Sequence, residues 1–405
     1  MVAAAYSMAL LVLAASVLWR CAVLLMAWRA WLVGKELAGD DEAERIVASQ
    51  ITDPVSFILV AWEGESGAQF AGRVRAALST GHPLMEVVVP IRVGWNDGTR
   101  ELAAVFGLVP VRMVCRRQIP MPEVDTVWRS PLFRNLTVVS LSHEGQDGLL
   151  DAAVNFASYP LLCFEFGQPL RGSVVSMVVP FVEDPIGCQC VVGPLAPSRR
   201  DDRGGAFWMY NAERIALLSA VPASASRLGV PVASILASKS ALVSTGGFTA
   251  TGGRGEVIVA LSRTGSAGSV VATRRCTGTA ATGRGGLLSR EWNLGLVSPG
   301  RLGVGATAVW TMLQVAELLG WLLAAAAVAA GVAGAASFAV VIGGGVAARL
   351  LLLGFEEMSY HTCRGVMLFR AIGAALVEPF GTRQAVLAVR AVSGFTGLYG
   401  RLRSR

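Results

Sequence analysis

Charged side chains are scarce in this chain. Only 16% of its 405 residues are charged, against about 25% in an average soluble domain, while 53% are hydrophobic and the mean hydropathy is +0.55. This composition excludes an ordinary globular protein that is soluble along its whole length. It indicates an integral membrane protein with room for one soluble domain.

Lysine is almost missing. Lys35 and Lys239 are the only lysines, so arginine carries nearly all of the basic charge behind the net +7. In a membrane protein such an excess more often sets the topology than binds nucleic acid. No basic stretch is interleaved with aromatic residues, so we expect no nucleic-acid partner.

Cysteine and histidine offer no recognisable site. The seven cysteines are scattered and odd in number, which does not favour a disulfide framework. Cys188 and Cys190 form the only close pair, and none of the three histidines lies near them in the sequence. We therefore expect no zinc site, and no serine or cysteine triad has a recognisable frame.

Three apolar segments are candidates for crossing a membrane. The first is residues 3–19, which Trp28 to Val33 extend. The others are residues 303–328 and 330–353, each long enough to span a bilayer. No basic residue precedes the first segment and no cleavage site is clear, so it reads as an anchor rather than a secretory signal. Glu317 interrupts the second segment, and we expect this acid to face protein rather than lipid.

The positions of the basic residues predict the topology. Arg20, Arg29 and Lys35 lie toward the end of the first segment, which places the N-terminus outside and the following domain in the cytoplasm. Residues 365–380 are short for a span and predict an amphipathic helix at the interface, although the sequence leaves open whether they span. The arginine-rich tail that follows is expected to be cytoplasmic, in a multi-pass protein of the inner (cytoplasmic) membrane.

The middle of the chain alternates short β-rich runs with helical patterns of about ten residues. This order predicts a parallel sheet wrapped by helices, with a functional edge at the carboxyl ends of the strands. Leu161 to Phe164 read as a buried strand, and Gly167 and Pro169 read as the turn that ends it. Residues 264–287 lack a hydrophobic period and predict a loop.

The order of these segments resembles the membrane-bound family 2 glycosyltransferases, which include cellulose, hyaluronan and poly-N-acetylglucosamine synthases. The stretches that carry the resemblance are PVSFILVAWEGE, MEVVVPIRVGWNDGT, HEGQDGLLDAAVN, YPLLCFEFGQPL, VVPFVEDP, SKSALVSTGGF, EVIVALSR, FEEMSY and VEPFGTRQ. They cover residues 52–395. The resemblance implies an α/β cytoplasmic domain of the glycosyltransferase A type (Rossmann-like) together with transmembrane α-helices.

The resemblance also implies a division of the chain. Residues 1–48 would be the N-terminal transmembrane anchor and linker, and residues 49–300 the cytoplasmic glycosyltransferase-2-like domain. Residues 301–405 would form a transmembrane hairpin, the amphipathic helix and the tail.

Members of this family move a sugar from a nucleotide diphosphate to a hydroxyl group. The reaction needs carboxylates to hold Mg²⁺ or Mn²⁺ and a carboxylate as general base. The positions that match these motifs hold other residues here: Val93 for the nucleobase acid, Gln146 and Gly148 for a lysine and an aspartate, Phe166 and Gln168 for the metal-binding aspartates, and Gly253 and Arg254 for the acids of the segment that supplies the base. We therefore expect no metal and no cofactor, with Mg or Mn needed only if the protein is active.

Four acids near these positions are weaker candidates for the family's metal-binding, base or nucleotide-binding roles. Glu165 precedes the first lost aspartate by one residue, and such a shift turns a strand side chain to the opposite face. It could meet a metal only if the strand end is frayed, and its simpler reading is a polar residue that caps the strand or faces a helix end. Glu256 matches a supporting glutamate of the family and is expected to hydrogen-bond within the domain. Glu63 and Glu65 lie where the family's first turn meets the nucleotide, and otherwise read as solvated loop acids.

Asp151 reads as a solvated or helix-capping residue.

Three functions are consistent with these features. The first is a pseudoglycosyltransferase that serves as a structural or accessory subunit of a membrane complex, beside an active envelope-polysaccharide synthase. The alternative is a divergent active glycosyltransferase of envelope polysaccharide or glycolipid synthesis that uses Glu165 or Glu256. The third is a binding module whose cleft holds a lipid, a pigment or a partner helix. In each case the partners include the lipid bilayer, and the sequence does not identify the protein partner or the oligomeric state.

Overall fold

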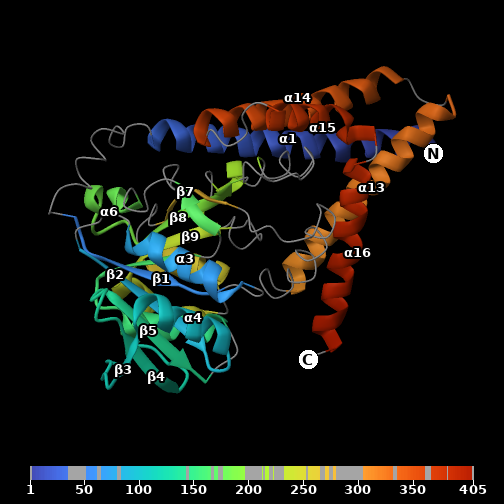
Figure 1. Ribbon diagram of the computed structural model, residues 1–405. Helices are drawn as coiled ribbons and strands as arrows, with labels where there is room; N and C mark the ends of the chain where they lie inside the picture. Colours follow the sequence, from blue (N-terminus) through green and yellow to red (C-terminus); the bar gives the residue numbers. More distant parts are fainter. Residues whose placement is uncertain are drawn as a thin grey trace. The chain divides into compact units, whose positions relative to one another are not determined.

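The protein was analysed as a computed structural model. It describes residues 2–34, 52–61, 65–79, 84–142, 146–165, 168–171, 177–196, 212, 215–218, 222, 232–251, 254–264, 270–272, 277–279, 304–331, 335–360, 366–380 and 382–403. The chain divides into two compact units. Residues 35–196 and 231–281 form the first, here named the sheet unit, and residues 1–34, 197–230 and 282–405 form the second, the helical unit (Figure 1).

The sheet unit alternates strands and helices, as the sequence predicts. Its strands are β1 (Val55–Leu59), β2 (Met85–Arg92), β3 (Val109–Val111), β4 (Val124–Arg129), β5 (Leu136–Leu141), β6 (Leu161–Glu165), β7 (Gln168–Arg171), β8 (Cys190–Ala196), β9 (Val232–Ser238), β10 (Val270–Ala272) and β11 (Thr277–Thr279). Its helices are α3 (Gly67–Leu78), α4 (Asn96–Phe106), α5 (Gln146–Phe156), α6 (Val179–Glu183), α9 (Lys239–Ser244), α10 (Gly247–Thr251) and α11 (Arg254–Thr264).

The sheet is mixed rather than parallel throughout. The strands run β3-β4-β5-β2-β1-β6-β9-β8-β11-β7, and β10 pairs with β8. The central strands β5, β2, β1 and β6 are parallel, whereas β4 and β9 run antiparallel to their neighbours. The prediction of a parallel sheet is therefore correct for the centre and wrong for the flanks, because a mainly apolar strand gives no sign of its direction.

The order of the central strands creates a topological switch point. From β1 the chain continues to β2 and β5 on one side of β1, and then returns to its other side as β6. In open α/β sheets, ligands bind at the carboxyl ends of the strands where the order reverses in this way. The β1–β6 boundary is therefore the place to look for a site.

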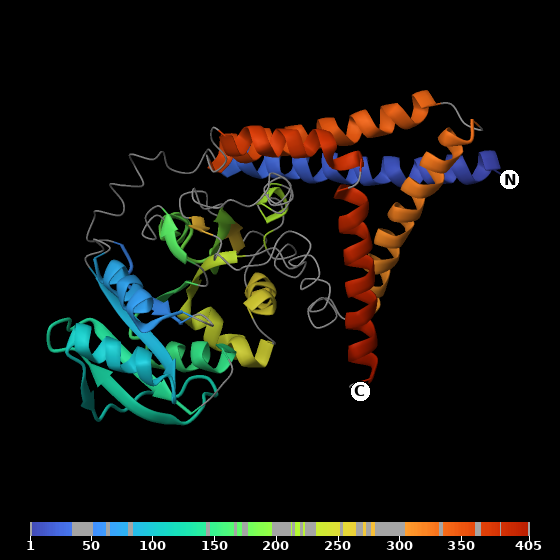
Figure 2. The ribbon, with the colours of Figure 1, turned by 45° about the vertical axis from the view of Figure 1, so that its right-hand side comes forward.

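Strand alternation distributes β6 between the two faces of the sheet. Leu161 and Cys163 join the buried cluster that includes Phe70 of α3, while Phe164 packs edge-to-face on Phe248 of α10, with ring centroids 4.9 Å apart. Figure 2 shows α3 and α4 on one face of the sheet and α5 with the C-terminal helices of the unit on the other. Successive side chains of a strand point to opposite faces. Glu165, two residues after Cys163, therefore faces α3 as well.

Two local predictions differ from the structure. Pro169 lies within β7 rather than in a turn, and Gly167 lies outside the described residues. The predicted loop 264–287 contains the short strands β10 and β11, which pair with β8. These strands have three residues each, too few to show a hydrophobic period, so their pairing depends on β8 and not on a local pattern.

Asp151 is buried rather than solvated. From α5 it accepts hydrogen bonds from the backbone N–H groups of Phe248 (2.6 Å) and Thr249 (2.9 Å) at the start of α10. Burial raises the pKa of Asp151, and the hydrogen bonds from Thr249 and Phe248 oppose that shift. The carboxyl group therefore ties α10 to α5, and α10 begins at Gly247 in a left-handed conformation with φ +85°.

We predict that Gly247→Ala destabilises the protein more than Gly246→Ala. Both glycines have a positive φ, so each substitution should cost about 1–2 kcal/mol of unfolding free energy. Only a Cβ at position 247 would also collide with the Asp151 carboxylate, which should cost roughly 1–3 kcal/mol more. Chemical unfolding of the purified protein measures both values, and equal losses would contradict the role given to Asp151.

The helical unit contains a framework of long helices and a short turn. They are α1 (Val2–Gly34), α13 (Val304–Ala329), α14 (Ala335–Tyr360), α15 (Val366–Val377), the 3₁₀ turn η2 (Glu378–Phe380) and α16 (Thr382–Arg403). Three segments are long and apolar enough to cross a membrane: Ala3–Ala30, Thr311–Ala329 and Ala335–Phe355. The prediction of three apolar helices is confirmed, while their orientation stays a prediction.

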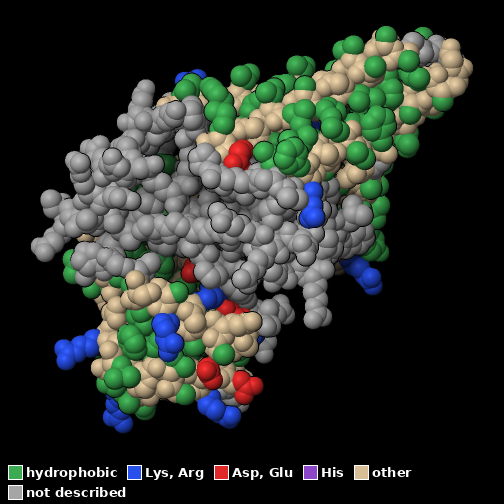
Figure 3. Space-filling view, turned by 45° about the horizontal axis from the view of Figure 1, so that its top comes forward, with side chains coloured by type: hydrophobic (Ala, Val, Ile, Leu, Met, Phe, Trp, Pro, Cys, Tyr) green, Lys and Arg blue, Asp and Glu red, His purple; other side chains and the backbone are tan. Residues whose placement is uncertain are grey.

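The outer surface of these helices is strongly apolar. Figure 3 shows hydrophobic side chains covering most of the face that the helices present in that view. Large side chains of α1 and α14 are exposed, including Leu11 (68%), Leu25 (69%) and Val340 (74%). A soluble protein rarely leaves so much contiguous apolar area in water, which supports a lipid environment for these helices.

Between themselves the helices pack through small residues. Ala9 and Leu13 of α1 pack on Ala324 of α13, and Ala27 of α1 packs near Phe355 of α14. Residues 382–403, expected only as a tail, form helix α16, which lies beside α13 in both ribbon views (Figures 1 and 2).

Candidate functional site

The switch point of the sheet unit holds a buried ionic cluster. It consists of Glu65, which precedes α3, Arg73 of α3, and Glu165, the last residue of β6. Their exposed fractions are 7%, 6% and 6%. Glu165 pairs in register with Leu59, the last residue of β1, so the cluster lies at the carboxyl ends of the two strands that flank the switch point.

Arg73 joins the two acids. Its Nη1 donates to both oxygens of Glu65, at 2.9 Å and 3.2 Å, and to the carbonyl oxygen of Val60 at 3.4 Å. Its Nη2 donates to Oε1 of Glu165 at 3.4 Å. Charge-assisted bonds of this kind are the strong ones, and they bring the turn after β1 and the end of β6 onto one helix.

Local structure explains why these three residues meet. Helix α3 begins with a capping box, in which Ser66 accepts from the backbone N–H of Gln69 and the Gln69 side chain accepts from the backbone N–H of Ser66. Arg73 follows Phe70 by three residues and so lies on the buried face of the helix. Glu165 follows Cys163 by two residues in β6, which turns it to the same side of the sheet.

The electrostatics of the cluster are a balance between burial and charge. Burial raises the pKa of Glu165, the charge and hydrogen bond of Arg73 lower it in part, and the nearby Glu65 raises it further. A lone carboxylate buried to this extent would cost several kcal/mol, so the guanidinium is what makes two neighbouring acids tolerable here.

The cluster revises the expectations for both acids. Glu65 is not a solvated loop residue, because it is buried in an ion pair. Glu165 faces α3, where its Oε1 is bound by the Arg73 guanidinium. Among the described side chains, no three histidine, cysteine or acidic groups come together in a way that could hold a metal ion.

The other predicted positions are only partly described. Val93 lies in the turn after β2 with 52% of its surface exposed, and Gly148 is buried in α5. For four positions the backbone alone is described: Gln146 begins α5, Gln168 begins β7, and Arg254 and Glu256 lie in the first turn of α11. Phe166, Gly253 and Glu63 lie outside the described residues.

Sequence reasoning missed Arg73, although a signal was present. In the helical run AQFAGRVRAAL, Phe70, Arg73, Val74 and Ala77 fall on one face, and the other three are apolar. An arginine inside an apolar stripe requires a buried acid as partner. Glu63 and Glu65 are the nearest acids in the sequence and are therefore the first candidates for that partner.

The cysteine pair has no reactive character. Cys188 and Cys190 are 3% and 0% exposed, and burial raises the pKa of Cys188 to about 12 and that of Cys190 well above its usual value. A thiol that does not ionise is neither a nucleophile nor a ready metal ligand. These residues therefore serve the core of the sheet unit.

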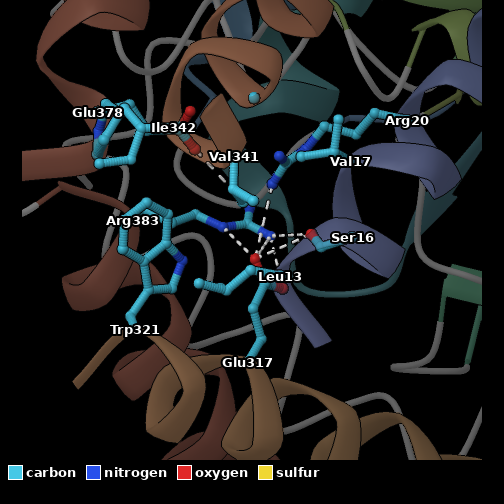
Figure 4. Close-up of a pocket in the computed structure, with 12 residues that line it drawn as sticks. Leu13, Ser16, Val17, Arg20, Glu317, Trp321, Val341, Ile342, Glu378 and Arg383 are labelled. Atoms are coloured by element: carbon cyan, nitrogen blue, oxygen red, sulfur yellow. Dashed lines mark hydrogen bonds and ion pairs between the residues drawn. The ribbon is translucent and has the colours of Figure 1, made fainter. Parts of the chain in front are cut away.

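A second buried cluster lies in the helical unit, here named the helical charge cluster. Its members are Ser16 and Arg20 of α1, Glu317 of α13, Glu378 of η2 and Arg383 of α16, which Figure 4 shows, together with Arg349 of α14. Arg383 binds Glu317 with both Nη2 contacts below 2.8 Å and with Nε at 2.9 Å. Arg349 donates to Glu378 at 3.2 Å and 3.3 Å.

A small cavity of about 20 Å³ adjoins this cluster, with polar groups on one side and apolar residues such as Leu13, Trp321 and Val341 on the other. That volume is enough for about one water molecule. Glu317 is only 8% exposed, which confirms that it faces protein rather than lipid. The cluster joins helices that are distant in sequence and brings no reactive acid to the surface.

We predict that Arg73→Met destabilises the protein by about 3–5 kcal/mol, because it leaves Glu65 and Glu165 buried without the guanidinium. Arg75→Met is the matched control, since Arg75 lies two residues further along α3 and is exposed. It should change the unfolding free energy by no more than about 0.5 kcal/mol. Equal effects of the two substitutions would show that the cluster contributes nothing.

Glu165→Gln should change how stability depends on pH. The folded protein holds the Glu165 proton more tightly than the unfolded chain, because burial raises the pKa above the ordinary 4.5. Its stabilising contribution is full below that ordinary value and is lost as the pH rises through the folded pKa. The unfolding free energy of the parent, relative to that of the variant, should therefore fall as the pH rises from 4.5. A difference that does not vary with pH, in unfolding curves taken across that range, would contradict this.

Comparisons with known proteins give little guidance. No protein-family model and no curated protein sequence matches the chain. Among solved structures the chain is similar to the mannosyltransferase PcManGT from Pyrobaculum calidifontis in complex with GDP-Man and Mn²⁺. The identity is 16%, the similarity covers 96% of this chain and 99% of that one, and the TM-score is 0.48.

Proposed function

We propose that this chain is a membrane-embedded pseudoglycosyltransferase, a protein of glycosyltransferase-2-like fold that has lost catalysis and acts as a structural or accessory subunit of a membrane complex. The observation that carries the proposal is the ionic cluster at the switch point. Arg73 engages both Glu65 and Glu165 where the chemistry would require acids open to a metal ion.

The loss of chemistry follows from what the reaction needs. The leaving diphosphate must be stabilised by a divalent cation or by equivalent positive charge, and removing one such group commonly costs about 3–4 kcal/mol of transition-state stabilisation. The motif positions supply valine, glutamine, glycine, phenylalanine and arginine in place of the acids and the lysine. Arg73 then engages Glu165, which directly precedes the motif position Phe166, and Glu65, which precedes α3.

The membrane assignment is supported by the three apolar helices and by the basic residues toward the end of the first of them. In this proposal the N-terminus lies outside and the sheet unit in the cytoplasm. A role beside an active envelope-polysaccharide synthase rests on fold analogy alone. It predicts that a defined partner co-purifies in fixed stoichiometry after gentle extraction and is identified by native mass spectrometry.

Nucleotide-sugar binding tests the loss of catalysis. We expect the thermal unfolding midpoint of the full-length protein to be unchanged by UDP-sugars or GDP-sugars, with or without Mn²⁺, and no nucleoside diphosphate to be released. A Mn²⁺-dependent stabilisation together with turnover would overturn the proposal. If that turnover disappears in Glu165→Ala or Glu256→Ala while the fold is kept, the divergent active enzyme is the correct description.

A further inference from the structure

We infer that residues 366–403 form a shallow re-entrant hairpin, which enters the bilayer as α15, turns at η2 and leaves on the same side as α16, with its outer face against lipid. The inference rests on the membrane embedding proposed above. It differs from the interfacial helix and cytoplasmic tail that the sequence predicts.

The turn of the hairpin is attached to two candidate spans, inside the apolar segment of each. Glu378 of η2 pairs with Arg349, six residues before the end of the apolar segment Ala335–Phe355. Arg383, just after the turn, pairs with Glu317, six residues after the start of Thr311–Ala329. Since α13 and α14 are consecutive spans, the start of one and the end of the other lie on the same side, and the turn lies inside the bilayer from that side.

Both arms of the hairpin lie along these spans. Ala371 and Ala375 of α15 pack on Leu353, near the end of α14. The first arm therefore lies along the part of α14 that leaves the membrane. Gly394 of α16 approaches Thr311 of α13 so closely that a Cβ there would collide with the threonine hydroxyl. Arg383 and Gly394 thus meet α13 in reverse order, and α16 returns antiparallel to it (Figures 1 and 2).

The break between the arms is chemically suited to this depth. Irregular backbone is tolerated inside a membrane only where its polar groups are satisfied. The Pro379 carbonyl accepts a hydrogen bond from the Gln384 side chain at 2.8 Å, and Glu378 is 4% exposed and ion-paired. Arg383 is bound by Glu317, so the hairpin brings in no uncompensated charge at its turn.

The outward face of the hairpin is apolar. Phe369 (77% exposed), Phe380 (78%), Phe395 (51%) and Tyr399 (68%) all present large side chains to the surroundings. Phe395 and Tyr399 follow the level of Thr311 and therefore fall near the headgroups, where aromatic residues concentrate.

The end of the hairpin is basic. Residues 379–405 contain five arginines and no acid, and three of the arginines are Arg401, Arg403 and Arg405. This charge complements anionic headgroups at the exit point of α16. The apolar face and the basic end together favour lipid as the occupant of this surface rather than another protein.

Depth-dependent quenching tests the hairpin. An NBD-bearing amino acid replaces one residue at a time, Phe369, Phe380, Phe395 or Tyr399, in the full-length protein in vesicles that contain brominated lipids. Leu322 of α13 and Val114 of the sheet unit (55% and 97% exposed) serve as the membrane and water references. We expect quenching at all four positions, deepest at position 380, with positions 369 and 399 on the same side of the bilayer.

The outcomes separate the possible arrangements. Equal, shallow quenching at all four positions would indicate an interfacial segment, and positions 369 and 399 on opposite sides would indicate a full span. Protection from water without quenching would mean that protein covers this face. Each of these results overturns the inference and leaves the proposed membrane embedding intact as long as Leu322 is quenched. If Leu322 is not quenched either, the membrane embedding fails together with the hairpin.

Discussion

A guanidinium held between two buried carboxylates recurs in both units of this protein, and the architecture of each depends on it. In the sheet unit Arg73 joins Glu65 and Glu165 across the switch point. In the helical unit Arg383 binds Glu317 and approaches Glu378 at 3.9 Å. An acid in such surroundings is very unfavourable alone and acceptable when paired, so each arginine fixes the positions of segments that are far apart in the chain.

In the sheet unit this pairing occupies the switch point, the place where ligands bind in open α/β sheets. Backbone topology alone places β1 and β6 side by side and opens the sheet at their carboxyl ends. The described side chains found there, Glu65, Arg73 and Glu165, form ion pairs with one another. The ion pairs hold Glu65, α3 and the end of β6 together at the switch point.

In the helical unit the same pairing allows charge to lie among apolar helices. Glu317 interrupts one apolar segment and Arg349 lies near the end of another, and both are satisfied by residues around η2. The requirement for buried partners then decides the course of the chain after α14, because Glu378 and Arg383 must reach the depth of their partners. A hydropathy profile cannot show this pairing. In such a profile each of these charged residues only lowers the mean hydropathy of its own segment.

The sequence by itself determined the alternation of strands and helices, the three apolar helices and the inward direction of Glu317. These are local properties, set by period, composition and side-chain chemistry, and they do not depend on distant contacts. Only the tertiary structure decided that the flanking strands are antiparallel, that Asp151 ties α10 to α5, and that Glu65 and Glu165 share Arg73. In each case the decisive partner lies elsewhere in the chain or on another element, and the free energy of burying a polar group depends on whether that partner is present.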